Sequence, residues 1–362
     1  MRRVISVPIV LILLLALVLP ARAASKTELE TALNDAGKFI LGAVSDPQVD
    51  SVGGEWAVIG LARSGCEVPD SYFANYYKTV EKYVKDRGGV LHDVKYTEYS
   101  RVILGLTAAG YDPRDVAGFD LTAPLADFGK TVSQGINGPI FALISLAGGK
   151  YPNPAEELYI AEILRRQLPD GGFNLTAGGG GKAIGANEKG DPDITGMALQ
   201  ALAKYRDRKD VNAAADKALL FLSGIQDEKG GFSGGFSGGS PVLESAAQVL
   251  IALCELGIPV DDPRFVKNGN TLTDNILSFK NQDGGFSHTR GGVSDLMSSE
   301  QALCALAAAK RAAEGNPGLY SPDDAAKSGG FVPPPAELDL PVKLFPVVIK
   351  IFYGILVRTG LL

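Results

Sequence analysis

Six short apolar segments recur along this chain, and their spacing constrains the fold more than any other feature. Their first residues are 45, 40, 56, 51 and 53 positions apart, and each segment ends in Gly, Ser or Ala followed by Leu. They are 56–61, 101–106, 141–146, 197–202, 248–253 and 301–306. A repeat at this spacing is typical of arrays of helical hairpins. Because apolar residues fill nearly the whole circumference, each segment is predicted to be a helix buried on all sides.

More amphipathic segments alternate with these six, at 28–41, 72–84, 158–166, 213–223 and 272–279. In the second of them Lys78, Glu81 and Lys82 supply a polar face. One outer and one inner helix per repeat gives six hairpins, and an open stack of hairpins would need capping repeats at its ends. The predicted fold class is therefore all-α, an α/α toroid of six helical hairpins (an α6/α6 barrel) over residues 24–315.

A second repeated element follows three of the outer helices and ends in Gly-Gly-Phe, at 167–173, 226–232 and 280–286. A glycine after a helix adopts the left-handed cap that other residues resist. We expect the Phe to pack between neighbouring hairpins, and the polar residue four positions before the first Gly to bond loop backbone. Residues 86–90 look like a degenerate copy of this element.

The Gln-x-x-x-Gly-Gly-Phe elements resemble the QW-type motifs of the terpenoid cyclase and protein prenyltransferase superfamily, whose fold is the α/α toroid. Residues 191–202 are similar to the segment that carries the cyclase aspartate motif. The chain resembles exported bacterial proteins with prenyltransferase/squalene-oxidase-type repeats, and the ring is similar to the α-domain of transcobalamin and intrinsic factor. The resemblance covers roughly residues 26–315. It implies a fold more than an activity, because one fold hosts several functions.

The resemblance implies that Asp193 would be the acid of a class II terpene cyclase. In the cyclase motif a second Asp follows this acid, whereas Ile194 stands here, and Gly196 replaces an Ala. Protonating an alkene requires a strongly acidic carboxyl group whose conjugate base is stabilised by its neighbours. The alternative is that Asp191 or Asp193 caps the helix that begins near Thr195, and we favour this interpretation.

The zinc site of protein prenyltransferases, built from Asp, Cys and His, has no counterpart in the sequence. The chain has only two histidines, His92 and His288, and no cysteine follows an aspartate at the required spacing. We expect no metal and no catalytic cofactor, although the likeness to cobalamin carriers leaves a bound corrinoid open. The three cysteines, Cys66, Cys254 and Cys304, are expected to be buried free thiols, with a Cys254–Cys304 disulfide as the alternative.

The inner helices of such a ring run in the same direction, so their first turns converge at one rim. Mixed polar, acidic and aromatic side chains at this rim suit a bulky ligand with an apolar body, such as a corrinoid, a glycan or a peptide. Alternatively, the acids only cap helices and side chains fill the cavity. We call the opening at this rim the mouth of the ring, and we expect the Gly-rich residues 174–190 to form a flexible loop over it. The candidate ligand-binding residues are Trp56, Tyr99, Arg101, Asn137, Phe141, Asp193, Thr195, Gln248, Glu300 and Gln301.

Residues 1–23 are predicted to be a signal peptide. Arg2 and Arg3 give a positive start, residues 4–19 are almost uninterruptedly apolar, and Ala21 and Ala23 form a small-x-small cleavage site. We therefore expect the ring to be extracytoplasmic, either secreted or attached to the cell surface.

The C-terminal part is expected to be a Pro-rich linker at 316–340 and an apolar, cationic tail at 341–362. The helix after Pro346 would be about 20 Å long, shorter than the roughly 30 Å of a bilayer core. This favours a tail that lies on a membrane surface. A helix packed on the ring, or a spanning segment from Pro341 onward, stays open.

The formal net charge of −6 gives no basic excess for binding nucleic acid. Our preferred function is an exported, non-catalytic protein that captures a small ligand or a partner protein at the rim and contacts the membrane surface through its tail. One alternative is an isoprenoid or terpenoid cyclase-like enzyme that uses Asp193 as acid. Another is a surface scaffold without a small ligand.

Overall fold

The computed structural model describes residues 24–234 and 239–325, and this part of the chain contains helices and no strands. The predicted signal peptide (1–23), residues 326–340 of the expected linker and the expected membrane tail (341–362) lie outside the described residues. Among the described helices, none combines the length and apolarity needed to cross a bilayer.

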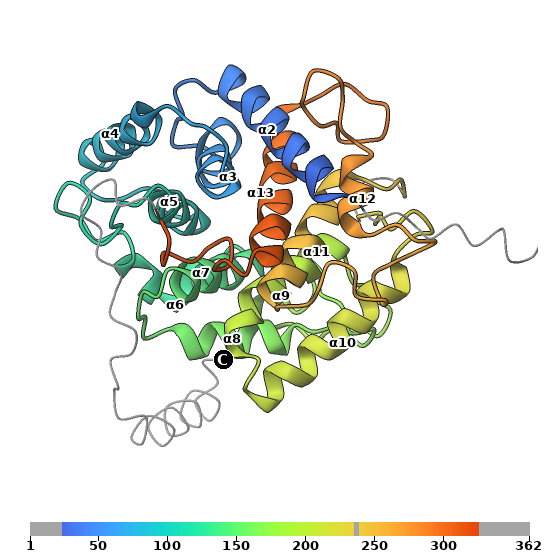
Figure 1. The fold of residues 1–362 in the computed structure, drawn as a ribbon. Coiled ribbons are helices and arrows are strands. Elements are labelled where there is room, and N and C mark those ends of the chain that lie inside the picture. Colours follow the sequence, from blue (N-terminus) through green and yellow to red (C-terminus); the bar gives the residue numbers. More distant parts are fainter. Residues whose placement is uncertain (1–23, 235–238, 326–362) are drawn as a thin grey trace, which may run out of the picture.

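Six helices form a closed inner ring, and each contains one of the six apolar segments (Figure 1). Each packs against the next along the chain, and the last packs against the first, which closes the ring. The predicted inner layer is therefore confirmed. These helices are α3 (Trp56–Ser64), α5 (Thr97–Ala108), α7 (Asn137–Gly148), α9 (Pro192–Leu202), α11 (Leu243–Glu255) and α13 (Leu296–Ala313).

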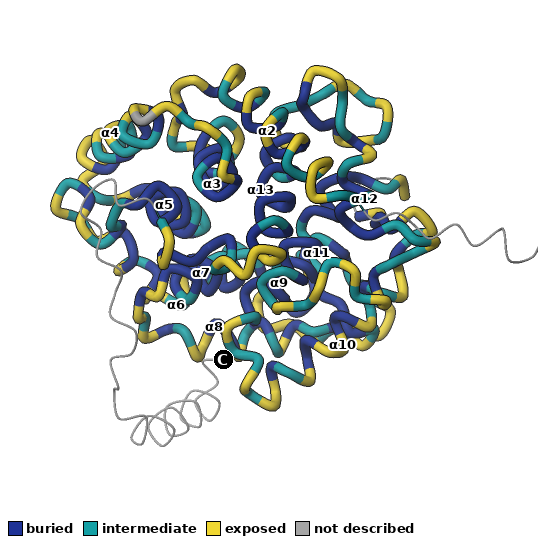
Figure 2. The backbone as a smooth tube through the Cα atoms, viewed as in Figure 1, coloured by how far each residue is buried: buried dark blue, intermediate teal, exposed yellow. Residues whose placement is uncertain are grey.

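The outer layer consists of α2 (Lys26–Ala43), α4 (Asp70–Asp86), α8 (Glu156–Arg165), α10 (Lys209–Ile225) and α12 (Leu272–Leu277). The third hairpin has two short helices instead, η2 (Ala123–Ala126) and α6 (Phe128–Val132). Short helical segments η1 (Ser51–Glu55), η3 (Gly179–Gly181) and η4 (Ala203–Tyr205) lie in connections. Figure 2 shows the buried residues concentrated in the inner ring and the exposed residues on the outer layer. This is the distribution that the two hydrophobic patterns predict.

The three Gly-Gly-Phe loops join neighbouring hairpins, and their Phe side chains are buried. The first glycine of each loop is left-handed, with φ of +91° at Gly171, +77° at Gly230 and +89° at Gly284. A Cβ atom at Gly171 would lie 2.6 Å from a carbonyl oxygen of α10, and one at Gly284 would lie 2.8 Å from a carbonyl oxygen of α2. Each loop thus fits against the outer helix of the following hairpin, and the third loop closes the ring onto α2.

The polar residue before each loop bonds as predicted in two of the three copies. Gln167 Nε2 donates to a carbonyl oxygen of its own loop at 2.9 Å and to one of α10 at 2.7 Å. Gln226 makes the equivalent pair of bonds, both at 3.0 Å. In the third copy Lys280 instead forms a 2.7 Å ion pair with Asp35 of α2.

Residues 316–325 differ from the linker that their prolines predict, because they pack against the ring. They contact the end at which the inner helices finish, which we call the lower end. Leu319 and Tyr320 are buried there, and the Tyr320 hydroxyl donates to Gln200 Oε1 at 2.9 Å. Glu255, at the end of α11, accepts from the Leu319 amide at 2.6 Å. Helix α13 ends before the left-handed Gly315, with φ of +69°, and Leu319 and Tyr320 then pack against the last turns of the inner helices.

The glycine-rich loop at 174–190 also differs from expectation. Gly178 packs against the end of outer helix α8, where its carbonyl oxygen accepts from Arg165 Nη2 at 2.8 Å. Asn174 binds the side chain of Glu188 and the backbone of Lys189 within the loop. None of the residues that line the cavities at the mouth comes from this loop.

Candidate ligand-binding site at the mouth of the ring

The N-terminal halves of the inner helices surround two adjoining cavities. The first, of about 220 Å³, is lined by Ser51, Trp56, Thr97, Arg101, Gln134, Asn137 and Phe141. The second, of about 190 Å³, is lined by Trp56, Phe141, Asp193, Met197, Glu244, Gln248, Ile251, Gln301, Cys304 and Tyr320. Trp56 and Phe141 belong to both linings, with ring centroids 6.1 Å apart and planes inclined by 58°, so this aromatic pair stands between the two cavities.

Seven of the ten candidate residues line these cavities, namely Trp56, Arg101, Asn137, Phe141, Asp193, Gln248 and Gln301. The other three are directed elsewhere. Tyr99 lines a separate cavity of about 520 Å³ beside the loop at 88–93, and its hydroxyl accepts from a backbone amide of that loop. Thr195 Oγ1 accepts from the amide of Phe173, and Glu300 accepts from a backbone amide of η1. These three point from their helices toward neighbouring loops instead of toward the ring axis.

The first cavity has a wall of paired charges. Glu55 is fully buried, and it accepts from Arg101 Nε at 2.6 Å and from the Tyr76 hydroxyl at 3.1 Å. Arg101 Nη2 also donates to Glu98 at 3.0 Å. Burial raises the pKa of Glu55 to about 7, although the Arg101 charge and hydrogen bond act in the opposite direction. The single guanidinium in this lining is therefore already bonded to two carboxyl groups.

A chain of side-chain hydrogen bonds runs along the second cavity. The Tyr320 hydroxyl donates to Gln200, Gln200 Nε2 donates to Gln248 Oε1 at 2.9 Å, and Gln248 Nε2 donates to Gln301 Oε1 at 3.1 Å. Since every bond runs in the same direction, the chain ends at the amide nitrogen of Gln301. This nitrogen is a donor group on a cavity-lining residue.

Asp193 has a polar atom that no described residue satisfies. The cap of α9 is Asp191, whose Oδ1 accepts from the amides of Asp193 and Ile194 at 2.9 and 3.1 Å, so the capping hypothesis is confirmed for Asp191 and not for Asp193. Asp193 Oδ1 is buried and has no hydrogen-bond partner among the described residues. Burial, assisted by the neighbouring Asp191 and Glu244 carboxylates, raises the pKa of Asp193 to about 6, while the Ser245 hydroxyl and His288 oppose the rise.

Beside Asp193, Glu244 is held by two neighbours. Its Oε1 accepts from the Ser298 hydroxyl at 2.6 Å, and its Oε2 lies 2.8 Å from His288 Nδ1. Glu244 lies in the first turn of α11, whereas His288 follows the third Gly-Gly-Phe loop. The third Gly-Gly-Phe loop brings this histidine to the acidic wall.

Some lining residues were missed by the sequence analysis although helical spacing carried a signal for them. Thr97 lies four positions before Arg101, Ile251 three after Gln248, and Cys304 three after Gln301, so each pair shares a helix face. Ser51 in η1, Gln134 and Tyr320 lie outside the inner helices, and no periodicity marks them.

The described residues contain no group of three or more His, Cys, Asp and Glu side chains that could hold a metal ion. All three cysteines are free thiols. Burial raises the pKa of the Cys254 thiol to about 12 and that of Cys304 further still, so neither is an activated nucleophile.

No family model and no curated protein sequence matches the chain. Among solved structures, it is similar to the unsaturated glucuronyl hydrolase from Bacillus sp. GL1, responsible for the degradation of glycosaminoglycan, with a TM-score of 0.55, 14% identity and coverage of 82% of this chain and 100% of that one. A structure described as wild-type glycosidase gives a TM-score of 0.53, 14% identity and coverage of 80% and 99%. Candida albicans protein geranylgeranyltransferase-I complexed with GGPP gives a TM-score of 0.47, 13% identity and coverage of 77% of this chain and 91% of that one. The glucuronyl hydrolase and glycosidase similarities show an α/α-toroid fold.

Proposed function

We propose that this protein binds a small, neutral, hydroxyl-rich ligand, one or two sugar units in size, at the mouth of its ring. The observation that carries the proposal is the pair of adjoining cavities with Trp56 and Phe141 between them. Aromatic faces pack against the C–H faces of sugars, while a few convergent amides and carboxylates bond hydroxyl groups and fix the orientation. Gln301 and Asn137 supply amides, and Asp193 supplies an unsatisfied carboxyl oxygen.

The charges at the mouth favour a neutral ligand over an anionic one. Arg101 is bonded to Glu55 and Glu98 and has little attraction left for another anion. Asp193 and Glu244 give the second cavity an acidic wall. Bringing a carboxylate ligand into this partly desolvated site would add a like-charge repulsion. An acidic sugar such as a glucuronate is therefore not expected here, although the fold is shared with glucuronyl hydrolases.

The size of the cavities argues against the larger ligands. At about 220 and 190 Å³, each is smaller than the roughly 300–1,000 Å³ typical of pockets for drug-sized ligands. A corrinoid enclosed by the ring and a folded polyprenyl chain both need more space. A carboxyl group with a pKa of about 6 is also a weak acid for protonating an alkene, so the cyclase alternative is disfavoured at Asp193.

A second candidate function is hydrolysis of a glycosidic bond, favoured by the presence of Asp193 and Glu244 in the wall of one cavity. A pair of carboxyl groups beside the scissile bond is the arrangement that glycoside hydrolysis uses. Asp193 would donate its proton to the glycosidic oxygen, while Glu244 takes a proton from the water that adds to the anomeric carbon. Release of reducing sugar by the wild type, lost in Asp193→Asn even at sugar concentrations that saturate the variant, supports hydrolysis. Binding without release supports the non-catalytic function.

We further propose that the ring acts outside the cytoplasm, where residues 1–23 would deliver it, and that residues 341–362 attach it to a membrane surface. The apolar, cationic character of residues 341–362 supports this attachment. Cell fractionation of the full chain and of a chain ending at residue 340 tests both points. The shortened chain should move from the membrane fraction to the soluble extracytoplasmic fraction, and an unchanged distribution contradicts the attachment.

Isothermal titration of the purified protein tests the proposed function. The panel comprises neutral and acidic oligosaccharides, cobalamin and a polyprenyl alcohol. We expect heat only with neutral oligosaccharides, and at least a tenfold loss of affinity in Phe141→Ala. Phe128→Ala is the matched control, because Phe128 packs against Tyr159 in the outer layer and lines neither cavity. Heat with cobalamin but with no sugar would overturn the proposal. No heat with any member of the panel would favour the alternative of a surface scaffold without a small ligand.

A further inference from the structure

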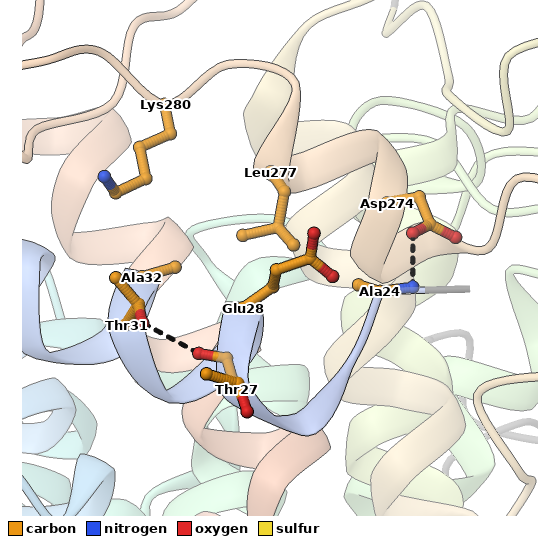
Figure 3. A pocket seen from close by; sticks show the side chains of 8 residues that line it. All are labelled: Ala24, Thr27, Glu28, Thr31, Ala32, Asp274, Leu277 and Lys280. Atoms are coloured by element: carbon orange, nitrogen blue, oxygen red, sulfur yellow. Dashed lines mark hydrogen bonds between the residues drawn. The ribbon is translucent and has the colours of Figure 1, made fainter. Parts of the chain in front are cut away.

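Residue 24 makes a hydrogen bond that joins the first hairpin to the last. The Ala24 backbone nitrogen donates to Asp274 Oδ1 at 2.7 Å, across 250 positions of sequence (Figure 3). Ala24 lies just before outer helix α2, and Asp274 lies in the first turn of outer helix α12. The contact therefore lies at the seam where the ring closes.

Asp274 divides its two carboxyl oxygens between two tasks. Its Oδ2 accepts from the amide and the hydroxyl of Thr271 at 2.8 and 2.7 Å, which caps α12, and its Oδ1 accepts from Ala24. On the other side, Glu28 Oε2 accepts from the Ser25 amide at 2.8 Å in a second capping box. Two carboxylates thus hold two consecutive backbone nitrogens, those of residues 24 and 25.

A cavity of about 410 Å³ adjoins this contact, and Figure 3 shows Ala24, Glu28 and Asp274 in its wall. Ala24 also borders a second cavity of about 710 Å³ on its other side. A larger, hydrated group at the nitrogen of residue 24 would therefore find space. The charged residues lining these two cavities are Lys26, Glu28 and Glu30 from α2, Asp261 before α12, Asp274 and Lys280 from α12 and the residues after it, and Lys310 and Glu314 from α13.

The lysines among these groups are already paired. Lys280 pairs with Asp35 at 2.7 Å, Lys310 with Glu314 at 2.9 Å, and Lys26 lies 3.8 Å from Glu30. Asp274 has no such cationic partner in the described part of the chain. The residues that line the seam can therefore accept one more positive charge next to Asp274.

We propose that cleavage between Ala23 and Ala24 produces an α-ammonium group on Ala24, which forms an ion pair with Asp274 and latches the first hairpin to the last. The proposal rests on the small-x-small site at 21–23 and on the observed contact of the adjoining nitrogen. An endoprotease of the signal-peptidase type adds water across the peptide bond. The new carboxylate leaves with Ala23, and the amine remains on Ala24 and takes up a proton.

Cleavage changes the strength of this contact without moving its atoms apart. A peptide nitrogen offers one neutral N–H group, whereas an ammonium offers three N–H groups and a full charge. The amide already makes a charge-assisted bond to the Asp274 carboxylate, and the ammonium adds the attraction between two opposite charges. The ion pair would thus form only after processing, and an unprocessed chain would have a weaker seam.

The pH dependence of the latch follows from the same charge. A neighbouring carboxylate raises the pKa of an ammonium above its unfolded value of about 7.7–8.0. The stabilisation is therefore fully present below that unfolded value and disappears as the pH rises through the folded pKa. A difference measured at pH 6 should be absent near pH 10.

The test uses protein beginning at Ala24 and the same protein extended by Gly-Ser, which keeps the amide of residue 24 but moves the charge away. At pH 6 we expect the extension to lower Tm by about 2–4 °C, and near pH 10 to have no effect. In Asp274→Asn the extension should have no effect at either pH. Asp35→Asn is the matched control, because it removes the other ion pair at the same seam and should leave the effect of the extension intact.

The mass of the exported protein tests the cleavage separately. A first residue other than Ala24 would overturn the assignment of the processing site. A native Ala24 terminus with equal Tm values for the two chains at pH 6 would overturn the latch. An effect of the extension that persists in Asp274→Asn would show that the ammonium acts through another group, and would also overturn it.

Discussion

The two ends of the ring both contain buried charged groups, but they pair them differently. At the lower end, Arg63 and Arg311 bind the same carboxylate, that of Asp324, at 3.1 and 2.6 Å. At the mouth, Glu300 accepts only a backbone amide at 2.9 Å, and Asp193 retains an unsatisfied oxygen. Two arginines thus share one carboxylate at the lower end, whereas Glu300 and Asp193 at the mouth form no ion pair with any described residue.

This difference is the one we expect between a structural end and a ligand-binding end. Opposite charges that pair across the lower end hold residues 317–325 against the inner helices and close that side of the ring. The Glu300 and Asp193 carboxyl groups lose hydration without forming an ion pair with any described residue, so their pKa values rise and the folded state is less stable than it could be. Perturbed carboxyl groups of this kind cluster at functional sites. This supports the proposal that the mouth is a binding site and that the lower end is a seal.

The largest effect should come from opening the lower end. Tyr320→Ala removes a buried aromatic ring together with its bond to Gln200, and we expect it to lower the free energy of unfolding by about 3–5 kcal/mol in urea titrations. Tyr320→Phe keeps the ring and should cost only about 1 kcal/mol. Equal stability of Tyr320→Ala and the wild type would show that this segment does not seal the ring.

The next effect concerns Glu300. Burial, with the nearby Glu55 and Asp50 carboxylates assisting and the Gly53 amide opposing, raises its pKa to about 8. A carboxyl group with a raised pKa contributes stability that is lost as the pH rises through the folded value, so Tm should fall between pH 6 and pH 9. Glu300→Gln keeps an acceptor for the backbone amide and should be more stable than the wild type at pH 9 by roughly 2–4 kcal/mol.

Exposed Glu314 provides the control for this measurement, because Lys310 lowers its pKa through a hydrogen bond. Glu314→Gln should leave the decline in Tm between pH 6 and pH 9 unchanged. A decline of the same size in Glu300→Gln would assign the pH dependence to other groups.

A smaller effect is expected at Asp193, whose pKa is raised to about 6. Asp193→Asn should stabilise the protein by roughly 1–3 kcal/mol at pH 8 and leave its stability unchanged at pH 3, where the wild-type carboxyl group is protonated in both states. The same substitution should weaken ligand binding, which would show that this position exchanges stability for function. Thermal unfolding at the two pH values makes the comparison, and destabilisation at pH 8 would contradict it.

The sequence was sufficient for the parts of the ring that repeat. The six inner helices have apolar residues around nearly their whole circumference, a pattern that burial on all sides explains. The Gly-Gly-Phe loops require a left-handed glycine at Gly171, Gly230 and Gly284. The outer part of the third hairpin was not predicted, since η2 and α6 are too short to show an amphipathic period.

The site was predictable only as far as the ring geometry determines it. Convergence of the first turns correctly brought Trp56, Phe141 and Asp193 together. It could not supply the rotation of each helix about its own axis, so Glu300 was placed in the lining although it faces η1. Tyr320 was missed because its contacts depend on tertiary packing that a proline-rich composition conceals.

If the mouth of the ring is the ligand site, the fluorescence of Trp56 should change when the ligand binds. Trp56 is the only tryptophan in the chain, and it lines both cavities. A titration with neutral oligosaccharides, followed by tryptophan emission, should give a saturable change with the affinity found by calorimetry. Asp193→Asn should weaken that affinity at least tenfold, whereas Phe128→Ala should not. Calorimetric binding that leaves the emission of Trp56 unchanged would place the ligand elsewhere and contradict the claim.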